Sequence, residues 1–497
     1  MSASAPSALS PTPQVLRPNL PLGVVVALSC VALFLVVLDT TIVTLALPQM
    51  HESLDMSAGR QQWVVTGYLV TLGGLLLPAA RAGDLFGHKR VFLFGVAVFT
   101  AASLTGGLAT DSTALIASRF VQGIGAAALT PTSLSLITTS HTDETRRQRA
   151  LAAWSITTAF AGTAGVLLGG VLTSELSWRW VLFINIPPGI ALFAAALRCL
   201  LPARAGTERV RLDIPGALGA TLGIGALAYG LSQAAADGWG SSKVLTALGA
   251  AAVLIACFVA VQLTGSRPLI PRTLLRLRTL LLGNLVMLLL GVVLNASFFF
   301  ISLYLQQAIG YSALRAGLAM APVTLVVIVG GFASRKLVLV LGPRNLIIGG
   351  GLVIAAGMVW LAAVPARPPV FLAHVLGPTL VVGAGLGFLL LSITLIGTSG
   401  VAPEDAGAAS GLLNTSRQVG GAIGLAVLTT IAATATTDAA GGSDPVEALV
   451  HGYRVAFLVC AGVMATAALI AAALPNVGAP GPESAGKTGK ERPTARR

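Results

Sequence analysis

Two charged residues lie inside stretches that are otherwise apolar, and their chemistry is the first thing to explain. Asp39 stands in Val24–Leu47, VVVALSCVALFLVVLDTTIVTLAL, whose other residues are apolar or carry small hydroxyl groups. Arg119 is the only arginine well inside another such run, Ala114–Ile137. A charge inside a bilayer costs about 2.5–3.5 kcal/mol even on a lenient scale, so it usually pairs and serves a function. We therefore predict that Asp39 is a functional carboxylate and that Arg119 is its partner.

The depths of the two charges support this pairing. The orientation argued below puts Asp39 about 8 residues, or roughly 12 Å, beneath the outer end of its helix. Arg119 then lies about 6 residues, or roughly 9 Å, beneath the same surface. Opposite charges at matching depth favour a buried ion pair or a shared aqueous cavity. The alternative is an Arg119 side chain that extends to the outer interface.

The composition defines the elements that must position these charges. The chain has 497 residues, of which 55% are hydrophobic and 10% charged, whereas soluble domains are about 25% charged. We predict an all-α polytopic membrane protein with about fourteen transmembrane helices, each near the roughly 20 residues that a bilayer requires. The expected spans are Gly23–Leu47, Gln61–Ala80, Val91–Ala109, Thr113–Ile137, Ala150–Thr173, Trp180–Leu201, Ile214–Ala234, Val244–Thr264, Leu280–Leu303, Ala316–Ser334, Asn345–Val364, Val370–Ile396, Asn414–Ala433 and Arg454–Leu474.

The distribution of Lys and Arg orients the chain. Loops on one side carry most of these residues: Arg81, Lys89, Arg90, Arg146, Arg147, Arg149, Arg198, Arg204, Arg209, Arg211, Arg267, Arg272, Arg276, Arg278, Arg335, Lys336 and Arg344. The opposite loops hold only Arg60, Arg179, Lys243, Arg315, Arg367 and Arg454. The positive-inside rule therefore predicts that both termini lie in the cytoplasm. Topology explains the net charge of +13, so we expect no nucleic-acid partner.

The spans group into a repeated layout. We expect a six-helix bundle over residues 23–201, two inserted helices with basic flanking loops over 202–279, and a second six-helix bundle over 280–474. The remaining segments, 1–22 and 475–497, are expected to be disordered cytoplasmic tails. Two such bundles are a transporter layout in which the substrate path follows the repeat interface.

The short charged loop between the second and third spans, Ala80–Arg90, is a candidate conformational latch. Gly87 suits a left-handed turn, and Asp84 could accept from backbone N–H groups or pair with the neighbouring cations. The latch residues are Arg81, Gly83, Asp84, Gly87, Lys89 and Arg90. The alternative is a solvated, positively charged loop. The corresponding loop of the second half, Arg335–Arg344, has cations and Gly342 but no acid.

Other residues inside the spans suggest packing and ligand contacts. Small residues allow close helix contact, and we assign this role to Gly123, Gly125, Gly165, Gly169 and Gly170. Polar and aromatic side chains at span positions suit an adaptable ligand wall. The substrate-cavity candidates are Thr40, Trp63, Tyr68, Gln122, Asn185, Asn295, Phe298, Tyr304, Asn414 and Gln418. Asn185 precedes Pro187, which indicates a helix break. The four cysteines show no metal-ligand spacing, and we expect no metal or cofactor.

Several of these stretches together resemble the major facilitator superfamily, and within it the fourteen-helix drug:proton antiporter family. Ala80–Arg90 resembles the signature loop of the superfamily, and Leu115–Ala127 is similar to the fourth-span motif of the family. Leu38–Leu47, followed by Trp63 and Tyr68, resembles the first-helix motif of fourteen-span members. Trp178–Pro187 and Gly407–Gly424 are also typical of that branch. The resemblance extends over nearly the whole of 23–474.

The resemblance implies a proton-driven exporter of a lipophilic drug or antibiotic that works by alternating access in the cell membrane. Asp39 would bind the coupling proton under the influence of Arg119, and the proton gradient would supply the energy. Partners would be the small substrate, protons and the lipid bilayer, and we expect a monomer. Two positions depart from the family pattern: Ala80 replaces a glycine, and Val166 replaces a proline in the fifth span.

Three alternatives are compatible with the sequence. Val166 leaves open a transporter of a metabolite or siderophore, working by export or proton symport. A membrane enzyme would need a nucleophile, metal or acid–base constellation, and none is visible in the sequence. A membrane sensor without transport would not need the two intramembrane charges. Transport of a small molecule is therefore the function that we predict.

Overall fold

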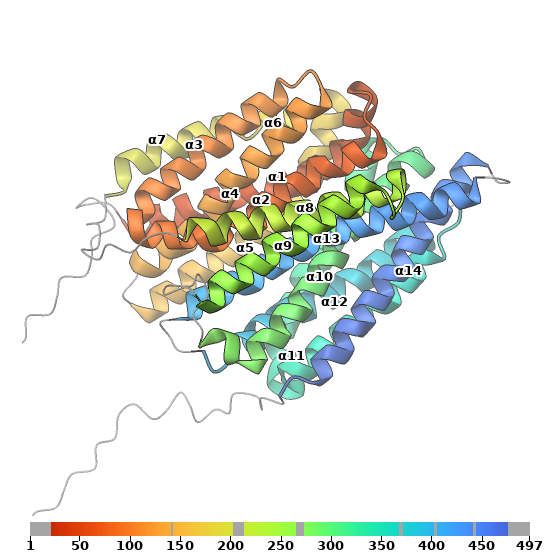
Figure 1. Ribbon diagram of the computed structural model, residues 1–497. Helices are drawn as coiled ribbons and strands as arrows, with labels where there is room; N and C mark the ends of the chain where they lie inside the picture. The colour runs from red at the N-terminus through yellow and green to blue at the C-terminus, as the bar shows by residue number, and fades with distance from the viewer. Residues whose placement is uncertain are drawn as a thin grey trace, which may run out of the picture. The chain divides into compact units, whose positions relative to one another are not determined.

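The structure is entirely helical where it is described. The computed structural model describes residues 21–140, 143–201, 213–264, 273–366, 371–401, 405–440 and 444–475. Every regular element in these ranges is a helix (Figure 1). In chain order they are α1 (Gly23–Ser53), α2 (Ala58–Phe86), α3 (His88–Gly107), α4 (Ser112–Ser140), α5 (Glu144–Glu175), α6 (Trp180–Phe183), α7 (Ile186–Cys199), α8 (Ile214–Asp237), α9 (Ser242–Thr264), η1 (Leu274–Arg276), α10 (Arg278–Leu303), η2 (Tyr304–Ala308), α11 (Ala313–Ala362), η3 (Leu372–Leu376), α12 (Gly377–Gly397), α13 (Ala406–Ala439) and α14 (Pro445–Ala472). The all-α prediction is confirmed.

Twelve helices of the described chain are long and apolar enough to cross a membrane. One of them, α11, is 50 residues long and contains two of the expected spans, on either side of a kink at Gly342. Helix α8 occupies the position of the expected seventh span but is outside those twelve. The polytopic membrane architecture is therefore established, and the total of fourteen crossings stays a prediction.

The chain divides into two compact units. The first comprises Met1–Leu269, Leu305–Leu318 and Leu425–Thr430, and the second comprises Ile270–Tyr304, Ala319–Gly424 and Ile431–Arg497. The predicted inserted helices, α8 and α9, belong to the first unit. They pack against each other along their length, and α8 also packs against α2 (Figure 1).

The ends of two helices differ from the expected span limits. Helix α2 continues through Phe86 and α3 begins at His88, so Gly87 alone separates them. The expected loop Ala80–Arg90 is therefore wrong in its extent. Hydropathy marks where the membrane ends, whereas a helix continues into water as long as its backbone bonds are satisfied. Similarly, α5 begins at Glu144 because the Asp143 carboxylate caps the backbone N–H of Arg146.

The expected sixth span is broken into two helices. Helix α6 ends at Phe183, α7 begins at Ile186, and Pro187 lies in the first turn of α7. Proline lacks the N–H that would continue the hydrogen-bond ladder, which explains the break. Asn185 stands at the break, as the sequence indicated.

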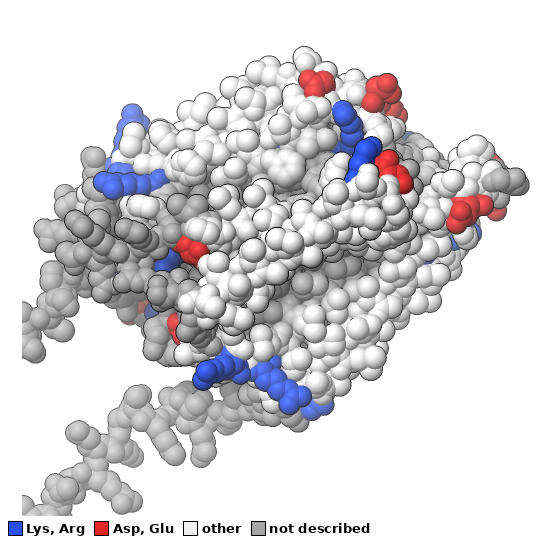
Figure 2. All heavy atoms as spheres, in the orientation of Figure 1, with Lys and Arg blue, Asp and Glu red and all other residues white. Residues whose placement is uncertain are grey.

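Charged side chains are sparse on the sides of the helices. Figure 2 shows that the face of α8 and α9 turned towards the viewer carries almost none, and that charges gather near the ends of this hairpin. Lys243 and Asp237 form an ion pair of 3.4 Å at the turn between α8 and α9. Apolar side chains such as Leu245 and Val253 are exposed along α9. Such a surface suits contact with lipid.

Candidate functional site

The centre of the candidate site is an ion pair between α1 and α4. A guanidinium nitrogen of Arg119, Nη1, lies 2.6 Å from Oδ2 of Asp39. The Asp39 side chain is fully buried, and the Arg119 side chain is 1% exposed. Within the described chain these are the only buried Asp, Glu, Lys or Arg residues. Of the two arrangements that the matched depths favoured, the structure has the buried ion pair.

The second oxygen of the Asp39 carboxylate is bound by two amides. Nε2 of Gln122 on α4 donates to Oδ1 over 2.7 Å, and Nδ2 of Asn185 donates to the same oxygen over 3.0 Å. Both amide side chains are fully buried. The carboxylate thus accepts three hydrogen bonds, and a buried charge is tolerated only when such bonds replace its lost hydration. Both oxygens of the Asp39 carboxylate are thus hydrogen-bonded inside the protein.

The guanidinium of Arg119 makes further contacts besides the one to Asp39. Its Nε donates to the backbone oxygen of Val64 over 3.0 Å, and Nη1 donates to Oε1 of Gln122. The guanidinium carbon lies 4.5 Å from the centre of the Tyr68 ring, a distance typical of a cation–π contact. The Tyr68 hydroxyl donates to the backbone oxygen of Val36 on α1. Helix α2 therefore supports the pair from a third side.

A further hydrogen bond extends the cluster to α3. Nε2 of Gln122 also donates to Oγ of Ser103 over 2.7 Å, and the Ser103 side chain is fully buried. The sequence analysis missed Ser103, because a single small hydroxyl in an apolar helix usually bonds its own backbone. It also predicted Tyr68, Gln122 and Asn185 as substrate-cavity residues. All three contact the charged pair in the structure, and their role in a substrate cavity stays a prediction.

Asn185 has one atom without a partner. Its Oδ1 is buried and makes no hydrogen bond to any described residue, although its Nδ2 donates to Asp39. A buried polar atom without a partner costs about 1–3 kcal/mol. Oδ1 of Asn185 is therefore an unused hydrogen-bond acceptor beside the Asp39 carboxylate. The helix break between α6 and α7 lets this residue reach α1.

Glycines hold the helices of the site close together. A Cβ atom at Gly123 would lie 2.6 Å from the backbone oxygen of Tyr68, and one at Gly125 would lie 2.9 Å from that of Gly95. Any side chain there would therefore push α4 away from α2 and α3, which would lengthen the contacts of Arg119 and Gln122. The absence of side chains is what allows this proximity.

Helix α5 approaches α1 in the same way. A Cβ atom at Gly165 or at Gly169 would lie 3.0 Å from a backbone oxygen of α1, that of Leu38 or of Ile42 respectively. Gly170 instead faces the start of α11, where a Cβ atom would lie 2.9 Å from the backbone oxygen of Ala313. All five predicted packing glycines thus lie where another segment approaches closely.

The predicted latch residues surround the turn at Gly87. Gly87 has φ 89°, which favours glycine. Arg81 lies 3.9 Å from Asp84, and both side chains are about half exposed. Lys89 instead donates through Nζ to the backbone oxygens of Leu197 and Leu200 at the end of α7.

Gly83 and Arg90, the two remaining latch residues, are not part of an ion pair with Asp84. A Cβ atom at Gly83 would meet the imidazole of His88, whose Nε2 lies 4.0 Å from Asp84. Arg90 is exposed and makes no hydrogen bond or ion pair to a described residue. The prediction that Lys89 and Arg90 pair with Asp84 is therefore wrong, since the helical start of α3 directs these side chains elsewhere.

The other cavity candidates of the first unit lie near the pair. The Thr40 hydroxyl bonds the backbone oxygen of Val36. Trp63 is half-buried between two aromatic rings, with its centroid 5.9 Å from that of Phe120 and 6.2 Å from that of Tyr229 on α8. Trp63 thus links the polar cluster of α4 to the inserted helices.

The candidates of the second unit form no comparable cluster. Asn295 donates to the backbone oxygen of Gly291 on its own helix, and the Tyr304 hydroxyl donates to that of Pro365. Asn414 accepts a hydrogen bond of 2.8 Å from Nη2 of Arg417. Phe298 lines a small apolar cavity between α10, α11 and α12, and Gln418 is buried on α13.

The fold and the site together define a polytopic helical membrane protein with a buried charged pair in one of its two units. The sequence pattern of the Major Facilitator Superfamily matches residues 29–425. The chain therefore belongs to the Major Facilitator Superfamily, and the predicted resemblance is confirmed.

Similar proteins are named for antibiotic export and resistance. The cephamycin export protein CmcT of Amycolatopsis lactamdurans is 41% identical over 450 residues, which cover 90% of this chain and 91% of the relative. The puromycin resistance protein pur8 of Streptomyces alboniger is 38% identical over 457 residues and 90% of each chain.

Solved structures of transporters share the fold. A bacterial homologue of the human lysosomal transporter Spinster, in an inward-facing and unoccupied conformation, matches with a TM-score of 0.64 and 17% identity, covering 90% of this chain and 96% of that chain. The peptide transporter POT in complex with sulfate matches with a TM-score of 0.66 and 13% identity, covering 93% and 96%.

Proposed function

We propose that this protein exports a small lipophilic antibiotic or drug across the cytoplasmic membrane in exchange for protons. Family membership and the names of the relatives support transport of such compounds. The proposed coupling of transport to protons rests on the buried ion pair of Asp39 and Arg119. The basic loops support an orientation with both termini in the cytoplasm. The working unit is a monomer, and the proton gradient replaces any cofactor.

Asp39 is the proton site in this proposal. The ionised carboxylate is held by Arg119, Gln122 and Asn185. Protonation removes the negative charge and leaves the Arg119 cation buried without a counter-charge, which is costly. Proton uptake therefore favours separation of α1 from α4, and proton release favours their contact. In one state α1 and α4 are in contact and the transport path opens to one side of the membrane. In the other state they are separated and the path opens to the other side, which is alternating access.

Asn185 adapts to both protonation states. Its Nδ2 binds the ionised carboxylate, while its Oδ1 has no partner. A half-turn of the amide brings Oδ1 towards Asp39, where it accepts the O–H of the protonated acid. Because an amide has a donor and an acceptor at nearly equivalent positions, the exchange needs no change in shape. The site then holds a proton without leaving the carboxyl group unsatisfied.

The charge distribution favours a neutral, zwitterionic or weakly cationic substrate. A dication inside the membrane needs carboxylates as counter-charges, and the described part of the second unit has no buried acid. Its polar and aromatic candidates supply hydrogen bonds and apolar contact instead. We assign substrate contacts to Thr40, Trp63, Asn295, Phe298, Tyr304, Asn414 and Gln418.

Accumulation of antibiotics and dyes in cells tests this function. We expect cells with the wild-type protein to exclude at least one compound of a broad panel, and an uncoupler to abolish the exclusion. Asp39→Asn should also abolish it, because the amide cannot carry the proton. Glu52→Gln, which changes an exposed acid at the end of α1, is the matched control and should retain exclusion. Exclusion that survives both Asp39→Asn and the uncoupler would contradict the proposal.

A further inference from the structure

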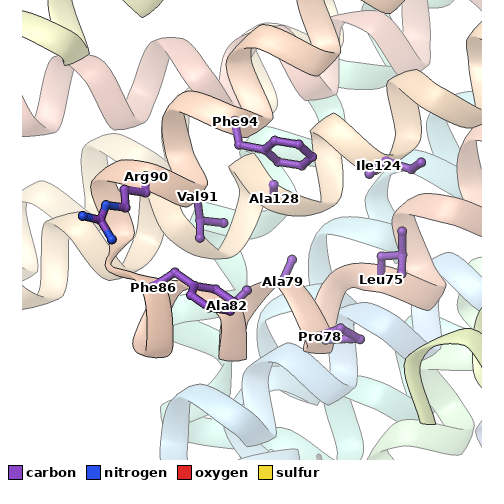
Figure 3. A pocket seen from close by; sticks show the side chains of 10 residues that line it. All are labelled: Leu75, Pro78, Ala79, Ala82, Phe86, Arg90, Val91, Phe94, Ile124 and Ala128. Carbon is purple, nitrogen blue, oxygen red and sulfur yellow. The ribbon is translucent and has the colours of Figure 1, made fainter. Parts of the chain in front are cut away.

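A groove of about 410 Å³ opens on the surface of the first unit, apart from the Asp39 cluster. Its walls come from α2, α3 and α4 (Figure 3). The lining residues are Leu75, Pro78, Ala79, Ala82, Phe86, Arg90, Val91, Phe94, Ile124 and Ala128. Figure 3 shows Arg90 at one end of this row of side chains and Leu75 and Ile124 at the other.

The lining of the groove is apolar except at the Arg90 end. Phe86 is 53% exposed and Phe94 is 55% exposed, although both are large hydrophobic residues. All three helices of the groove are membrane-spanning candidates. An exposed apolar groove on such helices is covered by hydrocarbon rather than by water. The shape and the lining therefore suit an acyl chain.

Arg90 adds a charge that no described residue neutralises. Its neighbours are engaged, since Arg81 lies against Asp84 and Lys89 bonds the end of α7. Arg90 has no ion pair or hydrogen bond to a described residue. Guanidinium binds phosphate oxygens in a bidentate manner, and cytoplasmic leaflets are rich in anionic lipid. The basic loops place this end of α2 and α3 on the cytoplasmic side.

We propose that the groove binds an anionic phospholipid of the cytoplasmic leaflet. One acyl chain lies along α2, α3 and α4, and the phosphodiester contacts the Arg90 guanidinium. The carboxylate of Asp84 does not line the groove and is paired with Arg81, so it opposes the anion only weakly. A lipid in this position touches both helices that flank Gly87 and stabilises the angle between them.

A fluorescent reporter placed in the groove tests the proposal without any measurement of transport. Phe94→Trp puts an indole at an exposed wall position of the groove. The full-length protein is reconstituted with phosphatidylglycerol or phosphatidylcholine whose acyl chains carry bromine, which quenches nearby tryptophan. The signal of the protein with Phe94 intact is subtracted to remove the native tryptophans. We expect the brominated phosphatidylglycerol to quench the reporter at a lower mole fraction than the phosphatidylcholine.

Two cation variants give this experiment its control. Adding Arg90→Gln to the reporter should weaken the preference for phosphatidylglycerol about fivefold, since one cation near an anionic surface contributes about 1 kcal/mol. Adding Arg198→Gln, which removes an exposed cation in the last turn of α7 outside the groove lining, should leave the preference intact. Equal quenching by the two lipids, or a preference that Arg90→Gln does not change, would overturn the proposal. Displacement of both lipids by an exported compound would assign the groove to the substrate and also overturn it.

Discussion

The two halves of the chain contain similar turns but differ in their acids. Gly87 between α2 and α3 has φ 89°, and Gly342 at the kink of α11 has φ 78°. After each glycine a cation bonds the end of another helix: Lys89 bonds Leu200 of α7, and Arg344 bonds Ala472 of α14 over 2.5 Å. The repeated parts are thus a backbone turn and a cationic cap, which belong to the scaffold.

An acid lies beside the first of these turns only, and a buried acid occurs in the first unit but not in the described part of the second. Asp84 lies before Gly87, whereas Arg335–Arg344 contains no acid before or after Gly342. Likewise Arg119 is paired with Asp39, whereas Arg417 on α13 is bonded to the neutral amide of Asn414. The two units thus share glycine turns and cations, whereas within the described chain the buried ion pair belongs to the first unit alone. The following predictions test this asymmetry.

The largest effect is expected when the buried pair is broken. Arg119→Gln leaves the Asp39 carboxylate buried without its counter-charge, which should destabilise the protein by about 3–5 kcal/mol. Arg417→Gln should cost less, because it leaves no carboxylate unpaired. Thermal unfolding of the purified variants checks the order. The double variant Asp39→Asn with Arg119→Gln should recover part of the loss, and strict additivity of the two single changes would contradict the pairing.

The glycine turns should respond equally in the two halves. Gly87→Ala and Gly342→Ala place a side chain at a positive φ, which costs about 1–3 kcal/mol at each position. Similar losses of thermal stability would show that both turns are scaffold. A large loss at Gly87 with none at Gly342 would mean that only the first turn is constrained, and would weaken the comparison.

Asn185 should set the pH range of coupling, and Asn295 on α10 should not. In Asn185→Asp a second carboxyl group faces Asp39 at the distance of the present 3.0 Å hydrogen bond. Like charges at that distance favour a shared proton. The pH of half-maximal transport should therefore rise by about one unit, worth about 1.4 kcal/mol. In Asn295→Asp no shift is expected, and an equal shift in both variants would refute the role of Asn185.

The smallest effect is expected at Asp84. Its contact with Arg81 is 3.9 Å long and half exposed, and such surface pairs contribute about 0.2–1 kcal/mol. Asp84→Asn should therefore leave the unfolding temperature nearly unchanged. Any effect of this variant on the rate of transport, at equal stability, would point to a conformational role for the turn at Gly87. A strong loss of stability would show that Asp84 has a structural partner in another state.

Much of this arrangement was predictable from the sequence, for a physical reason. Hydropathy locates the spans because lipid excludes polar side chains. The pairing of Asp39 with Arg119 was predictable because two buried charges at one depth need each other. The helix break at Asn185 followed from Pro187.

The rest depends on how each helix is rotated about its axis, which hydropathy does not specify. Gln122 and Asn185 were predicted as substrate-cavity residues, and the sequence did not show that both amides donate to Asp39. Ser103 could not be recognised from the sequence as a site residue, because it joins the site only by accepting a hydrogen bond from Gln122. Lys89 was expected to pair with Asp84 but caps α7, since a helix that starts at His88 turns this side chain towards the end of another helix.

The most direct test of the account is proton movement in vesicles that contain only the purified protein. An imposed gradient of an exported compound should drive protons in the opposite direction through the wild-type protein. With Asp39→Asn the same gradient should move no protons, while Glu52→Gln, at an exposed acid, should behave as the wild type. Proton movement through Asp39→Asn at the wild-type rate would contradict the assignment of Asp39 as the coupling site.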